Sequence, residues 1–252
     1  MLTVISPAKT LDFESQPITT CHTQPKFLAQ SEALIDELKQ LSTPGIATLM
    51  KLSDKLAGLN MARFQTWTRP FNLDNAKQAV LAFKGDVYTG LDAETMDDEG
   101  LEFAQQHLRI LSGLYGVLKP LDLIQPYRLE MGTKFPVGKN KNLYEFWRKK
   151  ITTALNDELY EDELLVNLAS QEYFKAIDAK ALKTPLIHVD FKEFKNGQFK
   201  TIAIFSKRAR GLMTRYIIDS NAQTAEELKS FNIDRYAYDA NLSSDHKLVF
   251  TR

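Results

Sequence analysis

The sequence predicts a single compact domain of mixed α and β structure, α+β or mixed α/β, over residues 1–252. Three observations support this fold class. Apolar strand-like runs and amphipathic helices are mixed without strict strand–helix alternation. The strongest strand signal is a hairpin whose two runs meet at Asn196-Gly197, a pair that favours a type I′ turn. No repeat, low-complexity segment or linker divides the chain.

Strands and helices follow one another along the first half of the chain. Residues 2–5 are apolar and β-branched and predict a buried strand. This strand ends in a Ser/Lys loop at residues 6–10, which is either an anion site or an ordinary connection. Further along, we expect helices at residues 26–41, 72–83 and 97–114, a glycine-flanked loop at 84–90, and an irregular, packed, apolar segment at 112–132.

The second half predicts a helix at residues 143–159 and a buried strand at 164–168. The hairpin follows at 186–205, and residues 205–218 are expected to pass from a strand end into a helix. Thr224 and Glu227 form a capping box that opens a short helix. A last strand is expected within residues 247–251, so the hairpin belongs to a mixed sheet.

Composition limits the class of protein. With 44% apolar and 25% charged residues the chain is an ordinary globular protein. No run of about 18 apolar residues spans a membrane, and the start lacks the features of a signal peptide. A single cysteine, Cys21, excludes an internal disulfide. We expect a cytoplasmic protein with no membrane association and no obligate protein partner.

The stretch around Gly58 has the pattern of a helix-hairpin-helix, a module that docks on a nucleic-acid backbone. Two helices, at 45–52 and 61–67, are expected to flank a tight turn at Gly58. Without a Cβ, Gly58 can adopt a positive φ and approach a phosphate. Asn60 would cap the second helix and leave N–H groups free for an anion, with Lys55 and Arg63 beside it. Alternatively, the turn is an ordinary part of the core.

A basic stretch offers a second nucleic-acid contact. Lys207, Arg208 and Arg210 are expected to lie between a strand and a helix, where they can follow a phosphate backbone, and Arg215 follows them. Lys9 and Lys84 are weaker candidates. The formal net charge is zero, but segregated charge can still form a basic cleft. A solvated basic turn is the alternative.

Enzymatic motifs are scarce. There is no GxxxxGK[ST], GxGxxG, CxxC, HExxH or GxSxG, and the four histidines lie far apart. We therefore predict no metal and no cofactor. Two pairs, Asp190 with Lys192 and Glu193 with Lys195, each lie on one strand face and resemble the acid-x-Lys of metal-dependent nucleases, but a solvent-facing hairpin is favoured. Five polar residues that end predicted elements could converge in a cleft: Lys9, Lys84, Asp86, Glu130 and Glu172. The acids Asp86, Glu130 and Glu172 are the catalytic candidates, although Glu130 most simply forms an ion pair with Arg128.

Six long motifs resemble the bacterial peroxide stress protein YaaA family: SPAKTLD at 6–12, LMKLSDKLAGLNMARF at 49–64, AFKGDVYTGL at 82–91, LSGLYGVLKPLDLIQPYRLEMG at 111–132, NLASQEYFK at 167–175 and KRARGLMTRYII at 207–218. The resemblance covers essentially the whole chain. It implies a cytoplasmic protein of the response to hydrogen peroxide. It also implies a DNA-binding group with a helix-hairpin-helix beside a positively charged cleft, and it brings no established catalytic activity.

We therefore expect a DNA-binding protein of the oxidative stress response. It would bind duplex or structured DNA without strong sequence preference. One alternative is a metal-dependent nucleic-acid-processing enzyme that uses the cleft carboxylates. Another is a protein that limits free intracellular iron, for which the scarcity of His and Cys leaves only weak carboxylate ligands.

Overall fold

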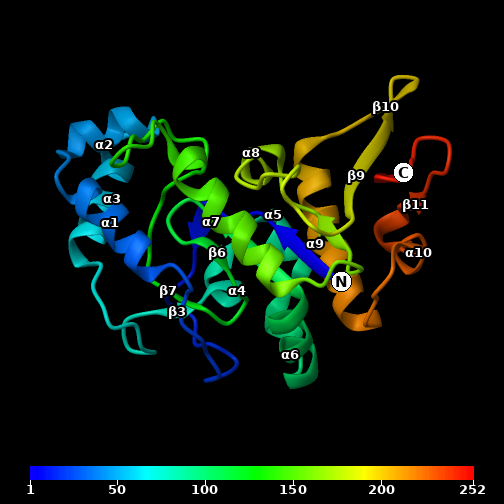
Figure 1. Ribbon diagram of the computed structural model, residues 1–252, viewed down its shortest axis with the longest axis horizontal. Coiled ribbons are helices and arrows are strands. Elements are labelled where there is room, and N and C mark those ends of the chain that lie inside the picture. The colour runs from blue at the N-terminus through cyan, green and yellow to red at the C-terminus, as the bar shows by residue number, and fades with distance from the viewer.

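The computed structural model describes all 252 residues and is built around one mixed sheet (Figure 1). Its strand order is β11-β12-β9-β8-β1-β5-β6, with β10 paired to β9. The five central strands, from β12 to β5, run parallel, while β6, β10 and β11 are antiparallel to their neighbours. The strands are β1 (Leu2–Ile5), β5 (Leu108–Ser112), β6 (Gly116–Leu118), β8 (Leu165–Asn167), β9 (Leu186–Lys195), β10 (Gln198–Lys200), β11 (Ala237–Tyr238) and β12 (Lys247–Thr251). The mixed fold class is confirmed.

Helices and two small strand pairs surround this sheet. The pairs are β2 (Thr10–Leu11) with β4 (Phe83–Lys84) and β3 (Lys77–Gln78) with β7 (Leu123–Ile124). None of the helices combines the length and apolarity needed to cross a bilayer. The helices are α1 (Leu28–Lys39), α2 (Thr43–Met50), α3 (Asp54–Thr66), α4 (Ala79–Ala82), α5 (Asp86–Leu91), α6 (Asp98–His107), α7 (Leu143–Glu158), α8 (Gln171–Phe174), α9 (Ala203–Ser220) and α10 (Ala225–Leu228), with 3₁₀ turns at Ala93–Thr95 and Ile233–Arg235.

Elements with strong local signals form as predicted. They include β1, whose four residues are all buried, the long helices α1 and α7, the β9–β10 hairpin and the capping box at Thr224. The helix predicted at 72–83 is wrong, because this segment forms a turn, β3, α4 and β4. The helix predicted at 97–114 is too long: α6 ends at His107, and the chain continues as the fully buried strand β5.

The predicted turn at Gly58 is also wrong. The helices α2 and α3 are joined at residues 51–53, and Gly58 lies in the middle of α3. Ser53 starts α3 by accepting a hydrogen bond from the Leu56 N–H, so residues 54–60 continue the helix. Asn60 is therefore no cap; its buried side chain donates to the Leu56 carbonyl at 2.8 Å. The backbone N–H groups near Gly58 belong to the helix, and no glycine-turn hairpin forms there.

The basic stretch also differs from its prediction, because residues 206–211 lie inside α9 rather than in a loop. Here α9 crosses α5 at very close range. A Cβ added at Gly211 would lie 1.8 Å from the Val87 carbonyl oxygen, and one at Gly90 would lie 2.3 Å from that of Arg208. Two glycines thus allow the backbones to touch, and this contact fixes the start of α9 beside the sheet.

Candidate functional site

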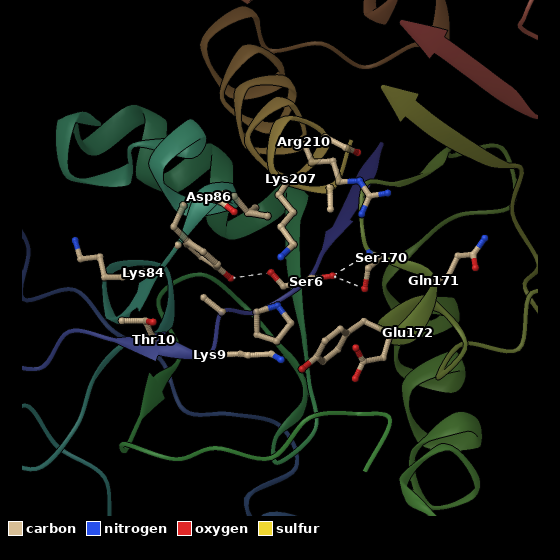
Figure 2. A pocket seen from close by; sticks show the side chains of 18 of the residues that line it. Ser6, Lys9, Thr10, Lys84, Asp86, Ser170, Gln171, Glu172, Lys207 and Arg210 are labelled. Carbon is tan, nitrogen blue, oxygen red and sulfur yellow. Dashed lines mark hydrogen bonds between the residues drawn. The ribbon is translucent and has the colours of Figure 1, made fainter. Parts of the chain in front are cut away.

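A cavity of about 600 Å³ opens at the carboxyl ends of β1 and β8 (Figure 2). The strand β1 pairs in parallel with β5 on one side and with β8 on the other. The connections of the chain therefore lead to opposite sides of β1, and the strand order reverses between β1 and β8. Such a switch point, outside the carboxyl ends of parallel strands, is where open α/β sheets bind their ligands. The cavity is thus a candidate binding site by its topology.

Hydrogen bonds hold the floor of the cavity in place. Ser6, directly after β1, accepts the Ser170 N–H on its Oγ at 2.9 Å and donates to the Ser170 Oγ at 3.3 Å. The buried Tyr88 hydroxyl donates to the Ser6 carbonyl at 3.1 Å. Two strand ends and α5 are thereby fastened together, so the polar atoms around Ser6 are positioned before any ligand arrives.

Two cations reach the cavity without a partner. Lys207 and Arg210, one helical turn apart on α9, line the cavity and take part in none of the ion pairs of the structure. The Arg210 Nε is buried and has no hydrogen-bond acceptor. Burial lowers the pKa of Arg210, while the Asp190 carboxylate acts in the opposite direction. In Figure 2 the Lys207 side chain extends toward Ser6.

The other two cations of the cavity are already paired. Lys9 lies 2.7 Å from Glu130, and Lys84 lies 2.6 Å from Glu94 and 3.8 Å from Asp12. Their charge is therefore partly neutralised. They can border a bound anion, but they supply less attraction to it than Lys207 and Arg210.

Two of the three carboxylates that were predicted to converge line the cavity. Asp86 and Glu172 line the same cavity as Lys9 and Lys84. Glu172 accepts the Gly132 N–H at 3.0 Å, which ties α8 to the irregular segment before α7. Glu130 does not line the cavity. It pairs with Lys9 at 2.7 Å and forms the predicted ion pair with Arg128 at 3.1 Å. The four lining residues come from three separate parts of the chain, because Lys84 and Asp86 are only two residues apart.

Other predicted site residues lie elsewhere. Arg215 binds Asp219 at 2.7 Å and Thr95 Oγ1 at 2.7 Å, so it joins α9 to the turn after α5. Arg208 is exposed on α9 but does not line the cavity. Lys55, Gly58 and Asn60 belong to α3, across the molecule from α9 (Figure 1).

Arg63 is the residue of α3 that connects to the cavity. Its pKa is lowered by burial first and then by the charge of Arg128. Arg128 pairs with Glu130, and Glu130 pairs with Lys9 at the cavity. A series of charged side chains, half-buried at Arg63, Arg128 and Glu130, therefore leads from α3 to Lys9 at the cavity.

The remaining acidic candidates of the hairpin are only partly available. Glu193 binds the Arg252 guanidinium at 2.8 Å and accepts a hydrogen bond from the Tyr236 hydroxyl. Asp190 is near enough to Arg210 to affect its pKa. No three His, Cys, Asp or Glu side chains gather where they could hold a metal ion.

Sequence analysis did not assign Ser6 and Ser170 as site residues, although both follow strands that the sequence predicts. The signal that was available is their position. Because the carboxyl ends of parallel neighbours meet at one sheet edge, polar residues directly after two such strands come together. What the sequence lacked was the pairing of β1 with β8, which lie more than 150 residues apart.

Fold and cavity together define an α/β protein with a polar cavity at the switch point of its sheet. The chain matches the family model described as peroxide stress protein YaaA over residues 1–242. It is 56% identical to a UPF0246 protein of Flavobacterium johnsoniae, with all of both chains covered. It is likewise 56% identical to a UPF0246 protein of Shewanella oneidensis, covering all of this chain and 99% of that protein. The chain belongs to the peroxide stress protein YaaA family, and this membership supports a role in oxidative stress.

Proposed function

We propose that this protein binds duplex or structured DNA through its phosphate backbone, without strong sequence preference, as part of the response to hydrogen peroxide. The observation that carries the proposal is the unpartnered pair Lys207 and Arg210 over the serine-lined floor of the cavity. Arginine binds phosphate oxygens through two N–H groups at once, and lysine adds a point charge.

An anion at this place would remove an energetic cost of the free protein. A charged group that loses water without gaining a partner is destabilised, and burial already lowers the pKa of Arg210. A phosphate between Arg210 and Lys207 would accept the missing hydrogen bonds. The first turn of α9, an 18-residue helix whose start lines the same cavity, adds partial positive charge.

A path for a longer strand is available beyond the cavity. Lys9, Arg128 and Arg63 lead from it to α3, and Lys55 is exposed on that helix. These side chains can contact phosphates but present no set of groups matched to base edges, and phosphate contacts carry no sequence information. The absence of sequence preference follows from this kind of contact.

The test is fluorescence anisotropy with a labelled duplex at several salt concentrations, with and without Mg²⁺, followed by a check that the duplex is intact. Wild-type affinity should fall steeply with salt, because each neutralised phosphate releases counterions. Lys207→Gln and Arg210→Gln should each weaken binding and reduce the salt slope by about 0.9. The matched control is Lys183→Gln. Lys183 is an exposed lysine just before β9, at the amino ends of the parallel strands and therefore opposite the cavity.

Unchanged affinity and slope in both cavity variants would contradict the proposal for this site, and no duplex binding by the wild-type protein would contradict the function itself. Cleavage of the duplex only with Mg²⁺ would favour a nucleic-acid-processing enzyme instead. Circular dichroism melts of each variant show whether the fold is retained.

A further inference from the structure

The β9–β10 hairpin projects from the body of the molecule (Figure 1) and carries two exposed phenylalanines. Phe194 and Phe199 are directly opposite in the antiparallel register, and their ring centroids lie 5.2 Å apart in an edge-to-face arrangement. Their side chains remain 62% and 39% exposed. Two aromatic rings held together in water, outside the core, are a feature of interaction surfaces.

The phenylalanines continue a strand face that lies against two helices of the cavity wall. Alternate residues of a strand share a face, which places His188, Asp190 and Lys192 on the same side of β9 as Phe194. The His188 ring packs against Phe174 at the end of α8, with centroids 5.1 Å apart, and Asp190 acts on Arg210 of α9. Both helices line the cavity, so this face of β9 leads from the cavity wall to the aromatic pair.

Lysines lie on both faces of the hairpin. By the same alternation, Lys192 shares the face of the aromatic pair, whereas Lys195 and Lys200 lie on the opposite face. None of the three takes part in an ion pair of the structure. Of the two acids on β9, Glu193 is held by Arg252 at 2.8 Å, and Asp190 lies beside Arg210 of α9. The exposed surface of the hairpin therefore combines aromatic rings with uncompensated cations.

We propose that this hairpin binds unpaired bases of DNA, with Phe194 and Phe199 as the stacking surface and Lys192, on the same face, as the phosphate contact. This inference rests on the proposed function and names the part of DNA that the protein prefers. A base within a duplex is stacked on both faces, so only an unpaired base can offer its face to an aromatic side chain. Uncompensated lysines favour a polyanion over an apolar protein partner. Lys207 and Arg210 would hold the same strand where it reaches the cavity.

The experiment compares three labelled DNAs at one salt concentration: a single strand, a paired duplex, and the same duplex with a short single-stranded gap. The wild-type protein should bind the gapped duplex more tightly than the paired one. The double variant Phe194→Ala with Phe199→Ala should lose about 5- to 100-fold on the gapped DNA, the range for one stacked base, and keep its affinity for the paired duplex. Since both rings are exposed, the fold should be retained.

Two further variants distinguish base stacking from nonspecific hydrophobic binding. Phe194→Leu with Phe199→Leu keeps apolar area but removes the π faces, and it should lose most of the same preference. Tyr160→Ala is the matched control, because Tyr160 is an aromatic residue that is 78% exposed. Its N–H donates to Glu163, which pairs with the N-terminus just before β1, so Tyr160 lies far from the hairpin tip, near the amino ends of the parallel strands. A 2-aminopurine in the gap reports the stacking directly, because its fluorescence should change with wild-type protein and not with the alanine variant.

Equal affinity for gapped and paired DNA, or an equal loss on both in the alanine variant, would overturn the inference while leaving duplex binding in place. No binding to any of the three DNAs would overturn the proposed function as well. A change in oligomeric mass of the alanine variant, measured without DNA by light scattering, would instead assign the phenylalanines to a protein–protein interface.

Discussion

The side chains of Asn167 and His188 form a hydrogen bond that requires an unprotonated Nδ1 on the imidazole. The Asn167 Nδ2 and the His188 Nδ1 are 2.9 Å apart, and the Asn167 Oδ1 accepts the Ala169 N–H at 2.9 Å. The amide nitrogen therefore donates, and the Nδ1 must accept with its lone pair. Burial lowers the pKa of His188, Asp190 opposes this effect, and Lys247 adds to it.

We predict that this residue makes the protein less stable below neutral pH. Because the pKa of His188 is lower in the folded than in the unfolded chain, its contribution is fully present above the unfolded value of about 6.5. The contribution is lost as the pH falls through the folded value, since the unfolded chain then binds the proton more readily. Urea unfolding midpoints of wild-type protein and His188→Gln, measured from pH 7.5 to 5, should converge as the pH falls. A difference between the two midpoints that stays constant with pH would show that His188 does not titrate in this way.

At the scale of elements, the crossing of α5 and α9 decides where the cations of the cavity lie. Gly211 and Gly90 bring the two backbones together, and any side chain there meets main-chain atoms rather than a flexible side chain. Lys207 and Arg210 lie one turn or less before Gly211 on the same helix. A change in the crossing would therefore move these two cavity residues as well as destabilise the fold.

We predict that Gly211→Ala lowers the free energy of unfolding by at least about 1–3 kcal/mol, the usual cost of overpacking, and weakens DNA binding. Gly58→Ala is the matched control, because nothing lies within 4 Å of a Cβ added there and the residue is in the middle of α3. It should stabilise the protein by up to about 1 kcal/mol through helix propensity. Thermal melts and anisotropy of both variants test this. A loss of stability on Gly58→Ala would mean that Gly58 does adopt a conformation special to glycine.

The elements also show what a sequence can predict. The helix at 26–41 has a long apolar face and Asn196-Gly197 forces a tight turn, so local chemistry alone determines both. Residues 76–83 are all buried, and their short strands exist only because they pair with β2 and β7. For α3, the cap at Ser53 was the correct start signal, but Gly58 was interpreted as a turn because glycine is common in turns.

The sequence predicts several residues of the candidate site, but it does not predict which segments of the chain come together to form it. Lys9, Lys84, Asp86 and Glu172 were identified because they follow predicted elements, and the structure brings them to one cavity. Lys207 and Arg210 were identified from charge alone, and their helical position only became visible with α9. Which strand ends lie side by side depends on sheet order, which is a property of long-range pairing.

At the scale of the whole molecule, the cavity joins the two halves of the chain. The loop after β1 and α5 provide one wall, and α8 and α9 provide the other. One hydrophobic core of 67 buried residues extends from Met1 to Phe250 through both halves. The binding site should therefore form only when the whole chain has folded, as expected for the single domain predicted from the sequence.

We predict that the protein unfolds in one cooperative transition, which its two tryptophans make testable. Trp67 donates to the Tyr115 hydroxyl at 3.1 Å and Trp147 donates to the Gly113 carbonyl at 2.8 Å, so both report on the part of the molecule around β6 and α7. The region of α9, α10 and β12 contains no tryptophan but contributes to far-UV circular dichroism. Urea curves followed by tryptophan fluorescence and by circular dichroism should coincide, as they do for a two-state domain. A separate transition at lower urea, seen only by circular dichroism, would mean that the second half unfolds on its own and first. In that case Lys207 and Arg210 would leave the cavity before the core around the tryptophans opens, and DNA binding would be lost at the earlier midpoint.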